Sequence, residues 1–360
     1  MRIRFVVLLI PIVGALAAFS GAGQSQRPAA AVPAPTNAAQ VTERIVGAAQ
    51  VLLKMLDDAG RSKVQFPFEG PQKTRWSNLP VGIFERQGLR LGDLGAPQRI
   101  AVMHLLATAL SQDGYRKVTE IMKGDEVLRT GQGARGGGGS GRGGGGGRGG
   151  PTFGEDEYYL AFLGTPSVTT PWMLQFGGHH LAINLTMAGS QASMTPSLPA
   201  AQPATYTIEG REIRPLGKEN DKAFALINAL DAALQKQAIL PYRVSDLVLG
   251  PLQDGKVIQP EGLRASALPA AQQTMLLEII REWAGIVTDG FAEPRMAEIR
   301  SNLPQTYFAW SGPTTNGSVA YFRIQGPTLV IEYAPQNSVD HIHTIYRDPT
   351  NDYGAKIVKK

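Results

Sequence analysis

A glycine-rich tract near the middle of the chain, residues 131–150, restricts most strongly what this sequence can fold into. Glycine holds 14 of its 20 positions. Because glycine loses more backbone freedom on ordering than any other residue, such a tract cannot form part of a packed core. We therefore interpret residues 131–151 as a flexible Gly/Arg-rich insertion at the surface, and we expect the fold to be built from the sequence on either side.

The arginines of this tract, Arg135, Arg142 and Arg148, raise the alternative of an RNA-binding segment. The charge balance argues against it. The formal net charge is +5, but Arg2 and Arg4 belong to the N-terminal leader, and without these five arginines the chain carries 30 basic and 30 acidic residues. A balanced body has no long-range attraction for polyanions, so we expect no nucleic-acid partner. The GxGxxG matches in the tract lack the flanking strand and helix of a dinucleotide site.

The N-terminus has the pattern of a secretory signal peptide, residues 1–22. Two arginines precede an apolar run at residues 5–19, and small residues follow it. The run is shorter than a membrane-spanning helix requires, and a Pro/Ala-rich stretch, residues 23–37, follows as a disordered tether. We therefore expect an exported protein, periplasmic or extracellular, that has no membrane association after signal cleavage. The alternative is a retained N-terminal anchor.

The absence of cysteine limits both stability and chemistry. The chain can contain no disulfide, no thiolate metal ligand and no cysteine nucleophile. Its stability must come from a hydrophobic core, for which 43% hydrophobic residues are sufficient.

Hydrophobic periodicity predicts helices early in the chain and strands late. Apolar residues recur at helical spacing in the segments 38–59, 96–112, 115–129, 218–237 and 270–299. Apolar runs of strand length occupy 158–164, 172–187, 205–210, 305–312, 318–326, 327–334 and 340–347. The last four have short connections and should pair as an antiparallel meander. We predict one α+β domain, residues 38–360, with a helical N-terminal part and two mid-chain helices packed on a mainly antiparallel sheet. No internal repeat is evident.

Four of the five histidines occur as two close pairs, His179–His180 and His341–His343. Alternate residues of a strand share one face, so His341 and His343 can converge on one metal ion. His179 and His180 face opposite sides of a regular strand, so one of them would be a ligand and the other would support it. We predict a divalent metal site, with zinc favoured and copper or iron as alternatives. The competing interpretation is two unrelated pairs of surface histidines.

Three charged residues near these pairs are further candidates for the site. Glu332 lies within the apolar strand LVIEYA, where a buried carboxylate needs a partner, and we assign it as general base or fourth ligand. Arg323 and Arg347 lie on neighbouring strands and could hold an anionic group of the substrate. The alternative for each arginine is a structural salt bridge.

Several blocks of the sequence resemble one protein family. They are KTRWSNLP, LATALSQDGY, FLGTPSVTTPWMLQFGGHHLAINLT, FAWSGP, YFRIQGPTLVIEY and DHIHTIYRDPTNDYG. In this order they resemble the exported bacterial proteins catalogued as domain of unknown function 3500. The resemblance runs from about residue 40 to the C-terminus except for the glycine-rich tract. It implies an exported single-domain protein, and it implies no activity.

The residues favour a metal-dependent hydrolase acting on a small-molecule or peptide substrate. In this hypothesis the ion activates water and Glu332 accepts its proton. A copper or non-haem iron oxidoreductase could use the same ligands, and a non-enzymatic metal-binding or ligand-binding module is the third hypothesis. The sequence contains no GxSxG elbow, no phosphate-binding loop with its lysine and no HExxH motif.

Overall fold

The computed structural model describes residues 37–131 and 150–358. The predicted signal peptide, nearly all of the tether and nearly all of the glycine-rich insertion lie outside these residues. Within the described ranges, no helix combines the length and the apolar character needed to cross a bilayer. The described residues form an α+β fold, as predicted.

The first part of the fold consists of four helices and a sheet, whose long strands follow the helices. Its elements are α1 (Ala38–Met55), α2 (Asp58–Val64), β1 (Gln65–Phe66), β2 (Leu89–Arg90), α3 (Ala96–Ala109), α4 (Gln112–Thr130), β3 (Tyr159–Leu163), β4 (Trp172–Gly178), β5 (Leu181–Ala188), β6 (Gln191–Ser193) and β7 (Leu198–Pro199). The sheet has the order β1-β3-β4-β5-β6, with β2 also paired to β3 and β7 to β5. All of these pairs are antiparallel except β1–β3.

The second part follows a two-stranded hairpin, β8 (Tyr206–Ile208) and β9 (Arg211–Ile213). Its elements are α5 (Gly217–Ala229), α6 (Ala232–Ala238), β10 (Leu263–Arg264), α7 (Ala270–Ala284), α8 (Asp289–Asn302), β11 (Tyr307–Ser311), β12 (Tyr321–Gly326), β13 (Leu329–Pro335), β14 (Ile342–Arg347) and α9 (Ala355–Val358). These strands form an antiparallel sheet in the order β10-β11-β12-β13-β14. The predicted C-terminal meander is therefore confirmed.

Capping residues divide helices that the periodicity predicted as single. Asp57 accepts a hydrogen bond from the Gly60 amide and starts α2, and Asp231 starts α6 in the same way through the Ala233 and Leu234 amides. The apolar period continues across both caps, which is why one helix was predicted in each place. The last predicted helix is also two helices, α7 and α8.

The two parts share one order of elements, although the sequence suggested no repeat. The order α1-α2-β1-β2-α3-α4-β3-β4-β5 recurs as α5-α6-Ile239-β10-α7-α8-β11-β12-β13. Ile239 takes the place of β1, because its parallel bridge to Trp310 matches the parallel pairing of Gln65 with Phe162.

The strand registers repeat as well. Successive partners are Leu89–Leu160–Phe176 in the first sheet and Leu263–Phe308–Ile324 in the second. Equivalent residues are 174 positions apart at Leu89 and Leu263, and 148 apart at Leu160 and Phe308. The spacing changes between the second helix pair and the following strand, where only the first part carries the glycine-rich insertion.

Counterpart residues meet where the two parts touch. Leu110 directly precedes the N-cap of α4, and it forms an antiparallel bridge with Val287, which directly precedes the N-cap of α8. Ser197 forms the same kind of bridge with Tyr346, its counterpart by strand pairing with β5 and β13. Antiparallel pairing of a residue with its own counterpart is what a two-fold axis produces. The two parts are therefore related by approximate two-fold symmetry.

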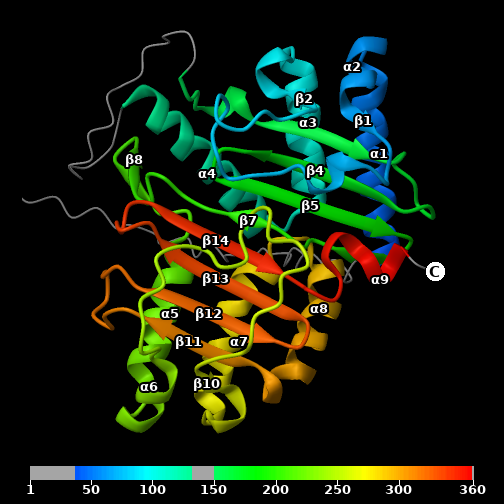
Figure 1. Cartoon of the computed structure of the whole chain (residues 1–360). Helices are drawn as coiled ribbons and strands as arrows, with labels where there is room; N and C mark the ends of the chain where they lie inside the picture. The colour runs from blue at the N-terminus through cyan, green and yellow to red at the C-terminus, as the bar shows by residue number, and fades with distance from the viewer. Residues whose placement is uncertain (1–36, 132–149, 359–360) are drawn as a thin grey trace, which may run out of the picture. The chain divides into compact units, whose positions relative to one another are not determined.

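The segment 197–201 joins the two sheets. On one side it pairs with β5 through β7. On the other side Ser197 and Ala201 exchange backbone hydrogen bonds of 2.8–2.9 Å with Tyr346 and Ile342 of β14. Figure 1 shows β5, β7 and β14 following one another across this junction. Residues far apart in sequence, on the β4–β5 hairpin and on β14, are thereby brought together.

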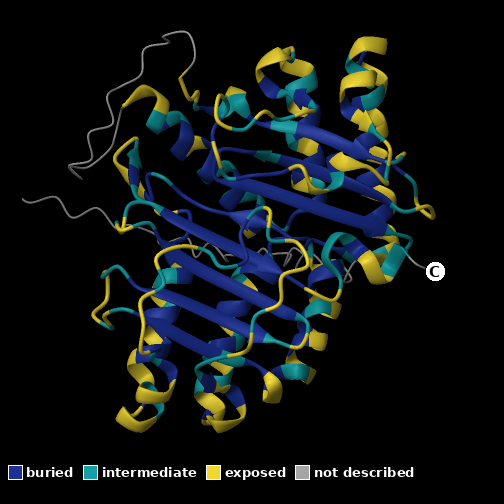
Figure 2. Ribbon diagram, viewed as in Figure 1, coloured by how far each residue is buried: buried dark blue, intermediate teal, exposed yellow. Residues whose placement is uncertain are grey.

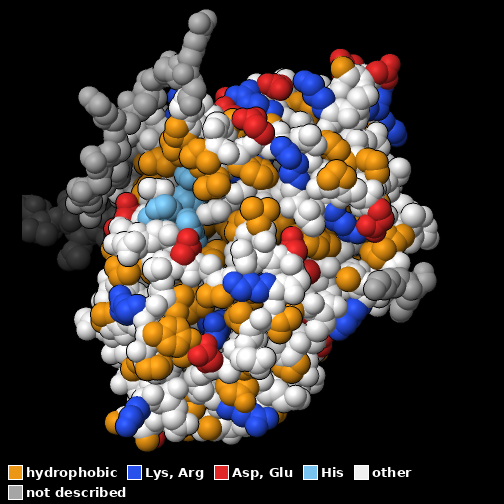
Figure 3. Space-filling view, in the orientation of Figure 1, with side chains coloured by type: hydrophobic (Ala, Val, Ile, Leu, Met, Phe, Trp, Pro, Cys, Tyr) orange, Lys and Arg blue, Asp and Glu red, His pale blue; other side chains and the backbone are white. Residues whose placement is uncertain are grey.

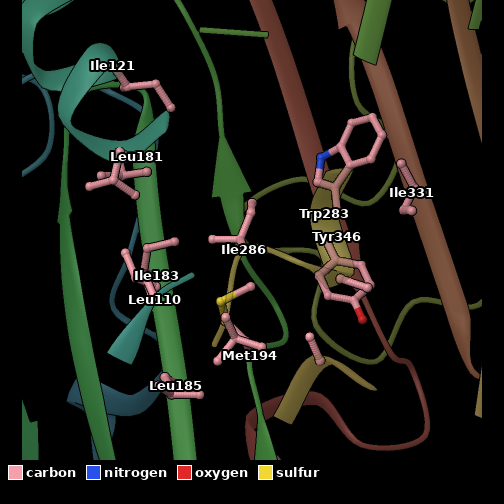
Figure 4. Packing of buried hydrophobic residues seen from close by; sticks show 14 of the residues in the cluster. Leu110, Ile121, Leu181, Ile183, Leu185, Met194, Trp283, Ile286, Ile331 and Tyr346 are labelled. Carbon is pink, nitrogen blue, oxygen red and sulfur yellow. The ribbon is translucent and has the colours of Figure 1, made fainter. Parts of the chain in front are cut away.

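One hydrophobic cluster extends across this junction. It contains buried side chains from both sheets and from the helices of both parts. Figure 4 shows Ile183 of β5, Ile286 after α7 and Trp283 of α7 among its members. The Trp283 indole nitrogen also donates a 2.9 Å hydrogen bond to the Thr344 hydroxyl of β14. The long strands of the two sheets, β3 to β5 and β11 to β14, are almost wholly buried, whereas the helices expose their outer sides (Figure 2).

Two equivalent glycines should be needed equally for stability. Gly88 and Gly262 have φ of 124° and 91°, and an added Cβ would lie 2.5 and 2.4 Å from the carbonyl oxygens of Leu160 and Phe308. We expect Gly88→Ala and Gly262→Ala each to lower the free energy of unfolding by about 2–5 kcal/mol in urea titrations.

The control is Gly189→Ala. Gly189 has φ of 62° but nothing within 4 Å of an added Cβ, so it should lose only about 1–2 kcal/mol. An equal loss at all three positions would show that the close approach to the neighbouring strand is unimportant.

Candidate metal centre

The first histidine pair forms the turn between β4 and β5. Gly178 and Leu181 are the closing pair, so His179 and His180 are the two turn residues, and the chain reverses there and not at Gly177–Gly178. His180 has φ of 59°, a left-handed conformation that two-residue turns usually reserve for glycine or asparagine. Backbone strain of this kind concentrates at functional sites. The turn places the His180 ring at the junction of the two sheets.

The second pair lies on one face of β14, as strand alternation predicted. His343 is paired with Ala334 of β13, and His341 directly precedes the strand. The intervening residues face the opposite way, since Thr344 accepts the hydrogen bond from Trp283 of the helical layer. His341 and His343 are therefore directed away from the helices.

The Nε2 atoms of three histidines converge. The distance is 3.0 Å from His180 to His341 and 3.0 Å from His341 to His343, and the ligand atoms of all three lie within 4.8 Å of one another. Ligands at 2.0–2.1 Å from a tetrahedral zinc ion are themselves about 3.3 Å apart. This triad could therefore hold a metal ion. Figure 3 shows histidine side chains gathered at one place on the surface.

Two neighbours orient His343. Its Nδ1 lies 3.1 Å from the Asp246 carboxylate, which fixes the proton on Nδ1 and leaves the Nε2 lone pair free. The Asn78 side-chain amide is 3.2 Å from that Nε2, and the Asn78 carbonyl accepts a 3.1 Å hydrogen bond from the His180 backbone. Burial alone would raise the pKa of Asp246, but its hydrogen bonds with His343 and the Leu247 amide outweigh burial and lower it.

Two imidazoles of the triad, those of His180 and His341, are held in the neutral form that binds metal. Burial, followed by the neighbouring histidines and Arg86, holds the pKa of His180 well below its ordinary value. Burial and the adjacent His343 lower the pKa of His341 to about 4. If His343 carries its proton on Nδ1, its Nε2 has no proton. One proton on His341 Nε2 must then serve the contacts with both His180 Nε2 and His343 Nε2. A cation at the common point would instead accept all three lone pairs.

His179 lies beside the triad and not within it. Its Nδ1 is 2.6 Å from Asp125 of α4, and its ring centroid is 3.7 Å from that of His180. The other Asp125 oxygen accepts a 2.8 Å hydrogen bond from the Gly154 amide, and Phe153 packs edge-on against the His179 ring. Asp125 and His179 are both buried. They form an aspartate–histidine dyad in contact with the triad.

The contacts of Glu332 are with backbone amides and a tyrosine hydroxyl, and not with the histidines near which it was predicted to act. Its carboxylate accepts hydrogen bonds from the Val248 and Leu249 amides and from the Tyr321 hydroxyl. Burial raises its pKa, which these hydrogen bonds partly offset. Among the described residues, no hydrogen bond joins Glu332 to a histidine, so its contacts give no support for a general base or fourth ligand. It anchors the loop that covers this face of the sheet.

The two predicted substrate-binding arginines are also bound elsewhere. Arg323 forms an ion pair with Glu261 at 2.7 Å. Arg347 pairs with Asp254 and Asp352 and donates to a backbone carbonyl. Both guanidinium groups are buried, and both fit the alternative of a structural salt bridge. Neither is among the residues that surround the triad.

Sequence reasoning missed four residues around the triad: Asn78, Arg86, Asp125 and Asp246. Asn78 and Arg86 lie in the connection between β1 and β2, Asp125 lies on α4, and Asp246 lies in the connection between α6 and β10, so none shares a periodic pattern with a histidine. Arg86 donates to the carbonyls of Ser77, Leu79 and Gly178 at 2.7 Å, which ties the Asn78 loop to the histidine turn. Burial lowers its pKa to about 10. The only available signal was the WSN block among the family-like motifs.

Acidification should destabilise the metal-free protein through this cluster. The pKa of His341 is about 4 when folded and 6.5 ordinarily, so between these values the unfolded chain binds a proton that the folded chain does not. The free energy of unfolding therefore falls as pH decreases from 6.5 towards 4. Between pH 7 and 4.5 the parent should lose about 1–2 kcal/mol more than His341→Gln, allowing for partial exposure.

Urea titrations with a chelator at both pH values measure this difference. The variant is the matched control, because every other titrating group is retained. Equal losses in the two proteins would show that His341 has no lowered pKa.

Comparison with known proteins places the chain in a family. The model described as "Protein of unknown function (DUF3500)" matches residues 38–355, a range that contains the triad, the dyad and both parts of the repeat. No curated protein and no solved structure shows a match. The match covers nearly all of the described fold and agrees with the resemblance seen in the sequence motifs. The chain belongs to this DUF3500 family.

Proposed function

We propose that this protein is a metal-dependent hydrolase whose divalent ion is held by His180, His341 and His343. The convergence of three Nε2 atoms within 4.8 Å carries the proposal. Three protein ligands leave a fourth position open, which distinguishes catalytic zinc sites from closed structural ones. Imidazole ligands without thiolate suit zinc, and also copper or iron.

A bound divalent ion would lower the pKa of water towards neutrality and polarise a carbonyl group. The residues of the chain provide the remaining functions. Asp246 holds His343 in the tautomer that presents Nε2, and Asn78 connects His343 to the His180 backbone. The strained turn fixes the His180 ring at the junction.

The aspartate–histidine dyad replaces Glu332 as the proposed general base. In this proposal Asp125 accepts a hydrogen bond from His179 Nδ1, and His179 Nε2 is the atom that accepts the proton. The His179 ring lies against the ring of His180, one of the three proposed ligands. Arg323 and Arg347 have no part in this proposal because their charges are paired elsewhere. We retain the proposal of an exported protein with a small-molecule or peptide substrate.

The proposed function is tested first by elemental analysis. The chain from residue 23 onward, purified without a histidine tag, should contain about one equivalent of metal. The double variant His341→Ala/His343→Ala should lose it and still fold, and His104→Ala, a histidine on α3, should keep it. No metal, and no uptake of added zinc, copper or iron, would contradict the proposal. Copper or iron would redirect it to an oxidoreductase.

The dyad should affect catalysis more than metal binding. With p-nitrophenyl esters as probes, Asp125→Asn and His179→Gln should lower kcat by about 10²–10⁴, the usual contribution of a general base, while metal content stays constant. Glu126→Gln is a control on the same helix and should have no such effect. Loss of metal in both dyad variants would instead make the dyad part of the metal site.

A further inference from the structure

A group of apolar side chains lies beside the histidine triad and has no role in the function proposed above. We define the apolar rim as Leu79, Val81, Ile83 and Phe153. Leu79 and Ile83 are 42% and 60% exposed, and the other two are half-buried. Exposed apolar side chains that cluster at one place commonly mark a binding surface. Figure 3 shows hydrophobic side chains directly beside the histidines.

Contacts place Leu79, Val81 and Phe153 next to the site, and Ile83 lies in the same loop, where its amide donates a 3.2 Å hydrogen bond to the Pro80 carbonyl. Leu79 follows Asn78, the residue that contacts His343. Val81 pairs with Thr152 through a 2.9 Å backbone hydrogen bond, and the next residue, Phe153, packs on the His179 ring at 4.9 Å. Two chain segments separated by the glycine-rich insertion thus form one surface against the dyad.

The charges around the triad disfavour an anionic substrate. Among the residues that the structure describes, side-chain hydrogen bonds to the triad from other residue types come from Asn78 and Asp246, and no lysine or arginine makes one. Arg86 donates through Nη2 to three backbone carbonyls around the site, and its buried Nη1 has no hydrogen-bond partner among the described residues. Asp246 adds a half-exposed carboxylate. A phosphate or carboxylate on the substrate would meet this acid, and Arg86 already donates to backbone carbonyls.

We propose that the histidine centre acts on neutral esters or amides whose apolar group lies on the apolar rim. This inference rests on the hydrolase function proposed above and specifies its substrate class. In the reaction, the hydroxyl of water adds to the acyl carbon, the C–O or C–N bond breaks, and the proton passes to the leaving alcohol or amine. Water is the only co-reactant.

Binding of alkyl hydroxamates tests the rim independently of turnover. A hydroxamate binds the metal, and its alkyl tail reports on the surface beside it. With zinc-loaded protein from residue 23 onward, calorimetric affinity should rise about two- to fourfold per methylene from aceto- to octanohydroxamate. Leu79→Ser and Ile83→Ser should flatten this series without changing metal content. Ile100→Ser removes a side chain that is 69% exposed on α3 and should leave the series unchanged.

The outcomes separate this inference from the function on which it rests. Bound metal with no dependence on tail length would overturn the rim alone, as would faster hydrolysis of p-nitrophenyl phosphate than of p-nitrophenyl octanoate. A rising series with no hydrolysis of any ester would support the rim as a binding surface and overturn the hydrolase. Failure to bind metal would overturn both.

Discussion

The site depends on the pairing of residues 197–201 with β14. This short segment is hydrogen-bonded to both sheets, and near its Ala201 end it contacts both chain segments that carry the histidine triad. The Ala200 amide donates a 2.8 Å hydrogen bond to the His180 carbonyl, while the neighbouring Ala201 pairs with Ile342, between His341 and His343. One segment therefore sets the position of the histidine turn relative to the HxH strand. A triad divided between two sheets can converge only if that pairing is fixed.

The approximate two-fold symmetry gives a structural reason for a carboxylate at Glu332, whose contacts do not support the predicted catalytic role. In the strand register of the second sheet, Glu332 of β13 lies opposite Arg323 of β12. The equivalent residues of the first sheet are Asn184 of β5 and Gln175 of β4. Asn184 donates to the Pro196 carbonyl, and Glu332 accepts from the Val248 and Leu249 amides. In both parts a buried polar side chain satisfies backbone groups of an adjoining loop. An acid within an apolar strand is explained by this need alone.

Sequence reasoning identified the parts of the site that follow from strand periodicity. Alternation correctly placed His341 and His343 on one face, because only the local backbone decides that property. It left open the choice between His179 and His180, since the answer depends on a left-handed turn residue that histidine rarely supplies. Asp125, Asn78 and Asp246 come from a helix and two loops whose approach is set by tertiary packing. The repeat is not evident in the sequence, because most equivalent positions hold different residues. What the two parts share is strand register and the positions of helix caps, and these become visible only in the structure.

The two parts differ at the histidine turn and at the connection that packs against the dyad. The hairpin equivalent to His179–His180 carries Pro327 and Thr328, so of these two turns only the first supplies a histidine to the triad. The connection from α8 to β11 is a short turn at Leu303–Gln305, whereas the equivalent connection in the first part runs from Gly131 to Tyr158. The end of this longer connection provides Phe153 against His179 and the Gly154 amide for Asp125. The segment that breaks the symmetry thus holds the dyad in place, and a symmetric copy of the fold would lack both the third histidine of the triad and the dyad.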